Sequence, residues 1–280
     1  MNTFSKSVIR FALAMALAAP VAAQNRNGNV DTITIPFSGE GERFVEAHLM
    51  HGGITVRGYD GDTVIVEATN GRFHRENKQE EDEKGLRTIR RSLTGLYAEE
   101  KDNRVTIGSK NLSGTIQLVI QVPFETSLKL GCMNQGDILV ENVSGELDLE
   151  NLNGKITVTD VSGTVLANAL NRDIVATFDA VHPEKPMSFI SLNGDIDVTL
   201  PADTKATLKM ETFSGSIKTG FDIELVGDRR DPVVSDHRNA GGRYRVEIEQ
   251  AVVGTINGGG PQFVFSSHNG EIRIRKRNTE

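Results

Sequence analysis

Residues 136–177 decide the fold, because they repeat every nine residues: GDILVENVS, GELDLENLN, GKITVTDVS, GTVLANALN and RDIVAT. The first four blocks open with a glycine and the fifth opens with Arg172. In each complete block the apolar residues fall two, four and seven places after the opener. The same side-chain phase over five blocks is an internal repeat, which indicates an architecture built by stacking similar units. The glycine openers are Gly136, Gly145, Gly154 and Gly163.

The spacing within a block predicts one short strand followed by one corner. Places two and four lie on one face of a strand, because strand side chains alternate between faces. Place seven is three residues further on, so the chain must turn before an apolar residue can face inward again. Place six carries Asn142, Asn151 and Asp160, and Asn and Asp tolerate the left-handed backbone conformation that corners use. Ser144, Asn153, Ser162 and Asn171 follow as turn residues or as hydrogen-bonded ladders.

Two blocks make a coil of about 18 residues, so the sequence predicts an all-β, single-domain β-solenoid of the parallel β-helix type. Ile138 should then lie over Ile156 and Ile174, and Leu147 over Val165. A β-sandwich of short antiparallel strands, which strand signals every eight to twelve residues also permit, stays open as the alternative.

The pattern extends over residues 32–280, with later blocks opening at Gly194, Gly215 and Gly270. Two charged or polar insertions interrupt it, near residues 71–92 and 222–242, and both are interpreted as exposed loops.

The cations Arg273, Arg275, Lys276 and Arg277 fall on the last strand of the chain. Lys and Arg on a strand discourage the pairing of a further chain, so this strand is expected to be an open edge.

The N-terminus has the features of an export signal. Lys6 and Arg10 precede a short apolar run, residues 11–19, and small residues follow at 21–23. This order is typical of a cleaved signal peptide, predicted here as residues 1–23, followed by a disordered lead-in at 24–31. The chain is therefore expected to act in the periplasm or at the cell surface, without a transmembrane segment after cleavage.

The composition excludes several classes of function. One cysteine, Cys132, cannot form an internal disulfide and is expected to be a buried apolar residue. A net charge of −7 argues against a nucleic-acid partner. With no Trp and 5% aromatic residues, the chain offers few flat surfaces for stacking on sugars.

The best candidates for chemistry are Glu146, Asp148 and Glu150, which project from one face of a strand. They are weak candidates for a divalent cation, and a solvated acidic strand is the favoured interpretation. His48 and His51 lie three apart on an expected strand and should face opposite sides, so no metal pair is predicted. No catalytic residue, cofactor or metal site is predicted.

Three stretches together resemble a known family: VPFETSLKLGCMNQGDILVENVSGELDLENLNGKITV, LPADTKATLKMETFSGSI and GTINGGGPQFVFSSHNGEIRIRK. The chain looks like a member of the bacterial β-strand-repeat family of unknown function whose members are described as candidate adhesins. The resemblance implies a β-strand-repeat fold and carries no catalytic motif.

The leading hypothesis is an exported, non-catalytic β-solenoid of the cell envelope, adhesin-like or structural, with an envelope protein or surface ligand as partner. A carbohydrate-active β-helix enzyme is the first alternative. A periplasmic sensory or scaffold module that acts through the two insertions is the second.

Overall fold

The computed structural model describes residues 30–70, 94–111, 114–226, 232–236, 244–248 and 251–277. The described residues form strands and connecting turns, and none of them belongs to a helix. Across these ranges there is consequently no helical segment that could cross a membrane. The predicted signal peptide at 1–23 and the insertion at 71–92 lie outside the described residues. The first strand begins at Val30, inside the expected lead-in.

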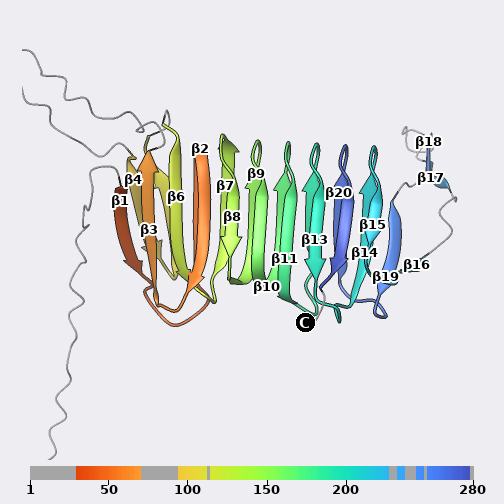
Figure 1. Ribbon diagram of the computed structural model, residues 1–280, viewed down its shortest axis with the longest axis horizontal. Coiled ribbons are helices and arrows are strands. Elements are labelled where there is room, and N and C mark those ends of the chain that lie inside the picture. Colours follow the sequence, from red (N-terminus) through yellow and green to blue (C-terminus); the bar gives the residue numbers. More distant parts are fainter. Residues whose placement is uncertain are drawn as a thin grey trace, which may run out of the picture.

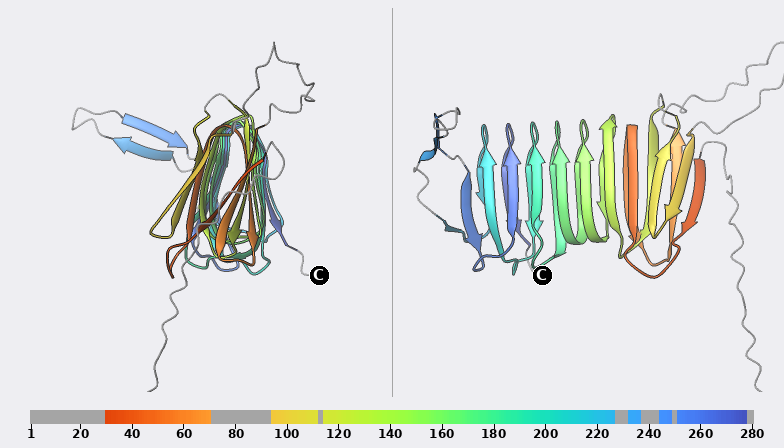
Figure 2. Two further views of the ribbon diagram at one scale, coloured as in Figure 1. Left: turned by 90° about the vertical axis from the view of Figure 1, so that its left-hand side faces the viewer. Right: turned by 180° about the vertical axis from the view of Figure 1, so that it is seen from behind.

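Two sheets face each other in a flattened stack, with the strands side by side along its long axis (Figure 1) and the sheets close together in the end view (Figure 2, left). We call them the front and back sheets, after Figure 1. The front sheet contains β1 (Val30–Pro36), β3 (Thr63–Asn70), β6 (Ile116–Pro123), the second half of β2 (Phe44–Tyr59), β8 (Ile138–Glu141), the first half of β10 (Ile156–Ala169), β11 (Ile174–Val181), β13 (Ile196–Leu200), β21 (Ile272–Lys276) and β15 (Ile217–Thr219).

The back sheet contains β4 (Leu96–Lys101), β5 (Arg104–Ser109), the first half of β2, β7 (Ser127–Asn134), β9 (Ser144–Asn151), the second half of β10, β12 (Met187–Ser191), β20 (Gln262–Ser267), β14 (Ala206–Thr212), β19 (Val252–Ile256) and β16 (Glu224–Leu225). Because β2 and β10 run through both sheets, one hydrogen-bonded network joins the two.

Neighbouring coils stack in parallel and in the register that the repeat predicts. Ile156 pairs with Ile138 on one side and with Ile174 on the other, and Val165 pairs with Leu147. The stacked side chains are buried and form one continuous apolar core between the sheets. The fold is thus all-β and solenoid-like, and the antiparallel β-sandwich alternative is wrong for the repeat.

The two corners of a coil differ, although the sequence repeat treats them alike. At the lower corner of Figure 1, Val143 and Val161 at place seven are buried, as predicted. At the upper corner, Leu152 and Leu170 occupy the same place and are exposed. The inward position there is place six, where Asn151 is only 2% exposed. The assignment of place seven to the core is therefore wrong for every second block.

The order of coils in space differs from their order in the chain at both ends of the stack. The coil formed by β2 lies between the coil of β5 and β6 and the coil of β7 and β8. In the same way, the coil of β20 and β21 lies between the coil of β12 and β13 and the coil of β14 and β15. The β2 coil is thus the second coil from the N-terminal end of the stack, and the β20–β21 coil is the second coil from the other end.

The insertion of β21 corrects the role expected for its cations. β21 is paired on both sides, by β13 and β15, so it is no open edge. Arg275 bonds Asp197 with Nε–Oδ1 at 2.7 Å, and Arg273 bonds Asp195 with Nη1–Oδ2 at 3.0 Å. These cations match the acidic residues of the neighbouring coil.

Antiparallel strands close both ends of the stack. At the N-terminal end β3 pairs with β6, β1 with β3, and β4 with β5. At the other end β19 pairs with β14, and β16 with β19. The segment 222–242, expected to be a loop, thus contributes β16. It also holds β17 (Pro232–Asp236), which pairs with β18 (Tyr244–Ile248) in a separate two-stranded sheet.

Candidate functional site

The acidic strand predicted as a weak cation site is largely neutralised by lysines. Asp148 accepts a hydrogen bond from Lys129 Nζ on β7 at 2.8 Å, and Glu146 accepts one from Lys185. Both contacts raise the pKa of the lysine concerned, mainly through the hydrogen bond. In the part of the chain that the structure describes, no group of three or more His, Cys, Asp or Glu side chains is arranged to hold a metal ion.

A second row of carboxylates lies on the front sheet, and its members bind backbone. Asp173 Oδ1 accepts the N–H of Asp195 at 2.9 Å, and Asp195 Oδ1 accepts the N–H of Glu271 at 2.9 Å. Glu271 also accepts hydrogen bonds from Lys218, Ser216 and Arg273, which lower its pKa to about 2. The repeat does not predict that Asp173, Asp195 and Glu271 stack, because Glu271 precedes β21, which reaches this position from the far end of the chain.

The glycine openers fall into two columns, one at each corner. At the upper corner a Cβ on Gly154 would lie 1.8 Å from the carbonyl oxygen of Gly136, so neighbouring coils touch through backbone alone. The upper column contains Gly52, Gly136, Gly154, Gly194, Gly270 and Gly215, and the lower one contains Gly145 and Gly163.

Place six has two separate roles, which the single repeat conceals. At the lower corner Asn142 and Asp160 have φ of 58° and 51°, as expected for left-handed corner residues. At the upper corner Asn151 is buried and acts through its side chain: Nδ2 donates to Gly136 O at 3.0 Å, and Oδ1 accepts the Gly154 N–H at 2.8 Å. Ser191 makes the corresponding contacts in a later coil, while Ala169 occupies the same buried place in the coil between them.

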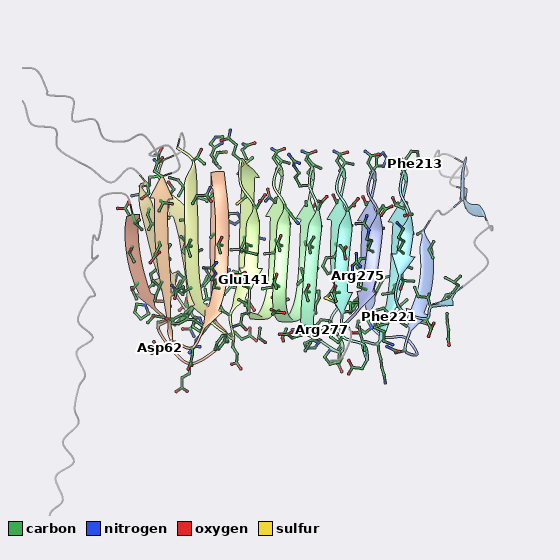
Figure 3. The ribbon with its side chains drawn as sticks, in the orientation of Figure 1. Asp62, Glu141, Phe213, Phe221, Arg275 and Arg277 are labelled. Carbon is green, nitrogen blue, oxygen red and sulfur yellow. The ribbon has the colours of Figure 1, made fainter. Side chains whose placement is uncertain are left out.

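Exposed apolar side chains line the upper corner in a single row, which we call the ridge. Backbone hydrogen bonds between successive corners set its order, and at its far end the Phe213 and His268 rings stack with centroids 4.9 Å apart. Phe213, the most exposed apolar member at 69%, stands on the upper edge in Figure 3. The apolar members of the ridge are Met50, Met133, Leu152, Leu170, Leu192 and Phe213, and the imidazole of His268 completes the row between Leu192 and Phe213.

An asparagine ladder runs beside the ridge and holds the corners together. Each side-chain amide donates from Nδ2 to Oδ1 of the previous member, at 2.8–2.9 Å. Such ladders are a stabilising feature of stacked parallel strands. Of the two roles expected for Asn153 and Asn171, turn residues or a hydrogen-bonded ladder, their side-chain contacts form the ladder. The five members are Asn134, Asn153, Asn171, Asn193 and Asn269.

A groove of about 610 Å³ lies along one part of the ridge, lined by Met50, Met133, Leu152 and Leu170. His48 and His51 both line it. The expectation that they face opposite sides is wrong, because the chain turns the upper corner between them. The polar lining includes Glu150, Asn111 and Asn168.

Cys132 belongs to the core beneath this groove. The residue is 3% exposed, and burial raises the pKa of its thiol to about 12. A thiol with so high a pKa is a poor nucleophile at neutral pH. The sequence-based expectation that Cys132 is buried is confirmed.

Comparison with protein families supports the resemblance found in the sequence. Residues 128–251 match the family model described as Toastrack DUF4097. The predicted resemblance to a family of unknown function is thereby confirmed for these residues. No curated protein matches the chain.

Solved structures with a similar course of the chain are described as candidate adhesion proteins. One, a candidate cell adhesion protein from Clostridium sporogenes, is 10% identical with a TM-score of 0.45, and the match covers 89% of this chain and 99% of the other. A candidate adhesin from Bacteroides fragilis is 11% identical with a TM-score of 0.38, covering 90% and 98%. A third, from Parabacteroides merdae, is 9% identical with a TM-score of 0.27, covering 90% and 98%.

Proposed function

We propose that this protein is an exported, non-catalytic binding protein of the cell envelope, in which a single β-solenoid domain presents the ridge to a protein partner. The observation that carries the proposal is the ridge itself. Leu152, Leu170 and Leu192 are each between 37% and 42% exposed and follow one another on successive coils. A contiguous apolar row on a protein surface marks an interaction site.

The rigidity of the upper corner supports a role in binding. The asparagine ladder fixes each corner to the next, and the glycine column keeps the coils in backbone contact. A row that is ordered before binding loses little conformational entropy when a partner docks. The ridge is thus a preorganised surface.

The chemistry of the ridge favours a protein over a glycan. Five of its seven members are Leu or Met, and the other two, Phe213 and His268, offer one flat stacked pair. Sugars are held by aromatic faces and hydrogen-bonding groups, whereas apolar side chains in a row fit an apolar strip on another protein. The carbohydrate-active alternative loses support because its acidic candidates Glu146 and Asp148 are paired with lysines.

The test compares how well a protein partner is captured by a variant altered on the ridge and by a control variant altered on the outer face of the front sheet. A variant with Leu152→Ser, Leu170→Ser and Leu192→Ser removes the ridge centre while leaving the core intact. The matched control carries Thr157→Ser, Thr177→Ser and Thr199→Ser on the front sheet. We expect immobilised wild type and control to retain the same envelope protein, identified by mass spectrometry, and the ridge variant to lose it. Equal capture by the ridge variant and wild type overturns the proposal.

Localisation has its own test. We propose that residues 1–23 direct export, because the charge, apolar run and small residues stand in the order that signal peptidase reads. Mass spectrometry of the protein from fractionated cells should find an N-terminus at Gln24 in the envelope or the medium. An intact Met1 in the cytosolic fraction contradicts the proposal.

A further inference from the structure

Two thioethers lie side by side at the start of the ridge. β2 and β7 pair in parallel with Leu49 opposite Cys132 and His51 opposite Asn134, which places Met50 next to Met133. Neighbouring strands are about 4.8 Å apart, so two flexible thioether side chains that start from these positions can bring their sulfur atoms together. Met50 is 44% exposed and Met133 is 47% exposed, and both line the groove.

An imidazole projects from the same face of β2 as Met50, because residues two apart on a strand share a face. His48 precedes Met50 by two residues, and its ring lies over Gly131, where an added Cβ would be 2.3 Å from His48 Nδ1. Its Nε2 is 3.2 Å from Glu46 Oε1. A proton on Nε2 donates to that carboxylate and leaves the lone pair on Nδ1, the arrangement by which a carboxylate orients a metal-binding histidine. His51 lines the same groove.

Methionine occupies the first two places of the ridge, whereas leucine occupies the next three. The next three members of the ridge are Leu152, Leu170 and Leu192, which are apolar and carry no donor atom. An apolar ridge alone therefore has no requirement for sulfur at its first two places. Thioether replaces leucine on the two coils that lie beside His48 and His51.

We propose that Met50, Met133 and His48 bind one soft monovalent metal ion, Cu(I) or Ag(I), with His51 as an additional donor at the rim of the groove. Thioether sulfur and imidazole nitrogen are the ligands that such ions prefer, and they need no deprotonation to bind. Harder cations select oxygen-rich sites, and Glu46 serves here to orient His48. The site shares Met50 and Met133 with the ridge, but it does not depend on the proposed protein partner.

The experiment titrates Ag(I) into the purified protein by isothermal calorimetry. Cys132 is replaced by Ala in every variant, since a thiol is a competing soft ligand. We expect one ion per chain, and at least tenfold weaker binding for Met50→Leu with Met133→Leu. Leucine occupies the same place on three other coils, so this variant should fold, which circular dichroism checks. The matched control, Met210→Leu, removes a buried thioether of β14 and should bind Ag(I) like the parent.

A second readout locates the ion. In a spectrum of protein with labelled methionine methyl groups, Ag(I) should shift the signals of Met50 and Met133 and leave those of Met187 and Met210 unmoved. His48→Gln should weaken binding while the two methionine signals still respond. Unchanged affinity in the double leucine variant, or shifts confined to other methionines, overturns the proposal. These outcomes are separate from the ridge test, which leaves Met50 and Met133 in place.

Discussion

The middle of the stack and its two ends follow different rules, although they share one core. From β7 to β13 each coil lies on the coil that precedes it in the chain. At the ends, β2 and the pair β20–β21 are inserted between coils that are not their neighbours in sequence. The middle can form by adding one coil after another, whereas each end requires a coil to pair on both sides with distant segments.

This difference has a consequence for folding. Contacts between distant segments cost loop-closure entropy before they add stability, so the ends should form later than the middle. Antiparallel strands then cover the outermost coils, and a covered edge resists pairing with other chains. The inserted coils thus pair with the outermost coils on one side and with the repeat on the other.

The largest expected effect comes from removing the inserted C-terminal coil. Truncation before residue 260 deletes β20 and β21, including the fully buried Phe263 and Phe265. Losing one buried phenylalanine costs about 3–5 kcal/mol, so losing both approaches the whole stability of a typical domain. We expect the cooperative thermal transition followed by circular dichroism to be lost or strongly lowered. Truncation after Arg277 is the control, and an unchanged melting temperature for the long deletion contradicts the structure.

At the upper corner, the requirement for glycine should be as strong in the middle of the stack, at Gly154, as near its end, at Gly270. A Cβ at Gly154 would lie 1.8 Å from Gly136 O, and one at Gly270 would lie 2.0 Å from Gly194 O. Each glycine-to-alanine change should therefore destabilise by about 3 kcal/mol or more, by forcing the coils apart.

The control is Gly258→Ala, where nothing lies within 4 Å of the added Cβ and φ is +86°. Only backbone strain of about 1–2 kcal/mol is expected there. Chemical denaturation of the three variants gives the ranking. A smaller effect at Gly270 than at Gly258 shows that the inserted coil packs loosely.

Substitutions of Asn151 test whether Asn and Ser can replace each other at the upper corner, in the middle of the stack and near its end. Asn151→Ala leaves the Gly154 N–H and the Gly136 carbonyl without their partner, at an expected cost of about 1–3 kcal/mol. Asn151→Ser should lose less, because Ser191 and Ser267 make this contact in later coils. Denaturant midpoints of both variants measure the difference, and equal losses argue against a shared corner design.

The smallest effect concerns the charges of the inserted strand. The pKa of Glu271 is held at about 2 by Lys218, Ser216 and Arg273, below its ordinary value of 4.5. A depressed pKa means that the carboxylate contributes stability above about pH 4.5 and loses that contribution as the pH falls through about 2. Glu271→Gln should lower the melting temperature modestly at pH 7 and converge with wild type near pH 2.

The double variant with Lys218→Met sharpens this last prediction. Once the first hydrogen-bond donor to Glu271 is gone, the glutamine change should shift the melting temperature less than it does in wild type. Melting curves between pH 2 and pH 7 supply the comparison. An identical shift in both backgrounds shows that the ion pair with Lys218 contributes nothing.

The sequence predicts the middle of the molecule well and the ends poorly, for a physical reason. Strand alternation and corner residues act over a few positions, so the registers of Ile138, Ile156 and Ile174 follow from spacing alone. Pairing of β21 between β13 and β15 is a contact over about 55–80 residues, and no local pattern encodes it. From the sequence alone, the cations of β21 therefore predict an open edge strand.

The candidate site was partly predictable. The role of Asn153 and Asn171 in a ladder follows from their identical place in alternate blocks, which is the same corner of successive coils. The exposure of Leu152 and Leu170 does not, since a nine-residue repeat gives both corners the same apolar place. Place six is polar and buried at Asn151, Ser191 and Ser267, but Ala169 and Cys132 fill the same place at other upper corners, so no single residue type there marks the corner in the sequence.

The sequence by itself determined the coil, because alternation sets which side chains enter the core and glycine sets how closely coils can stack. Only the tertiary structure decided which coils are neighbours at the ends and which corner faces solvent. Those outcomes depend on contacts between distant segments and on a second strand packed behind the first. The ridge and the groove beside His48, Met50 and Met133 belong to that second category, since no single stretch of the chain contains them.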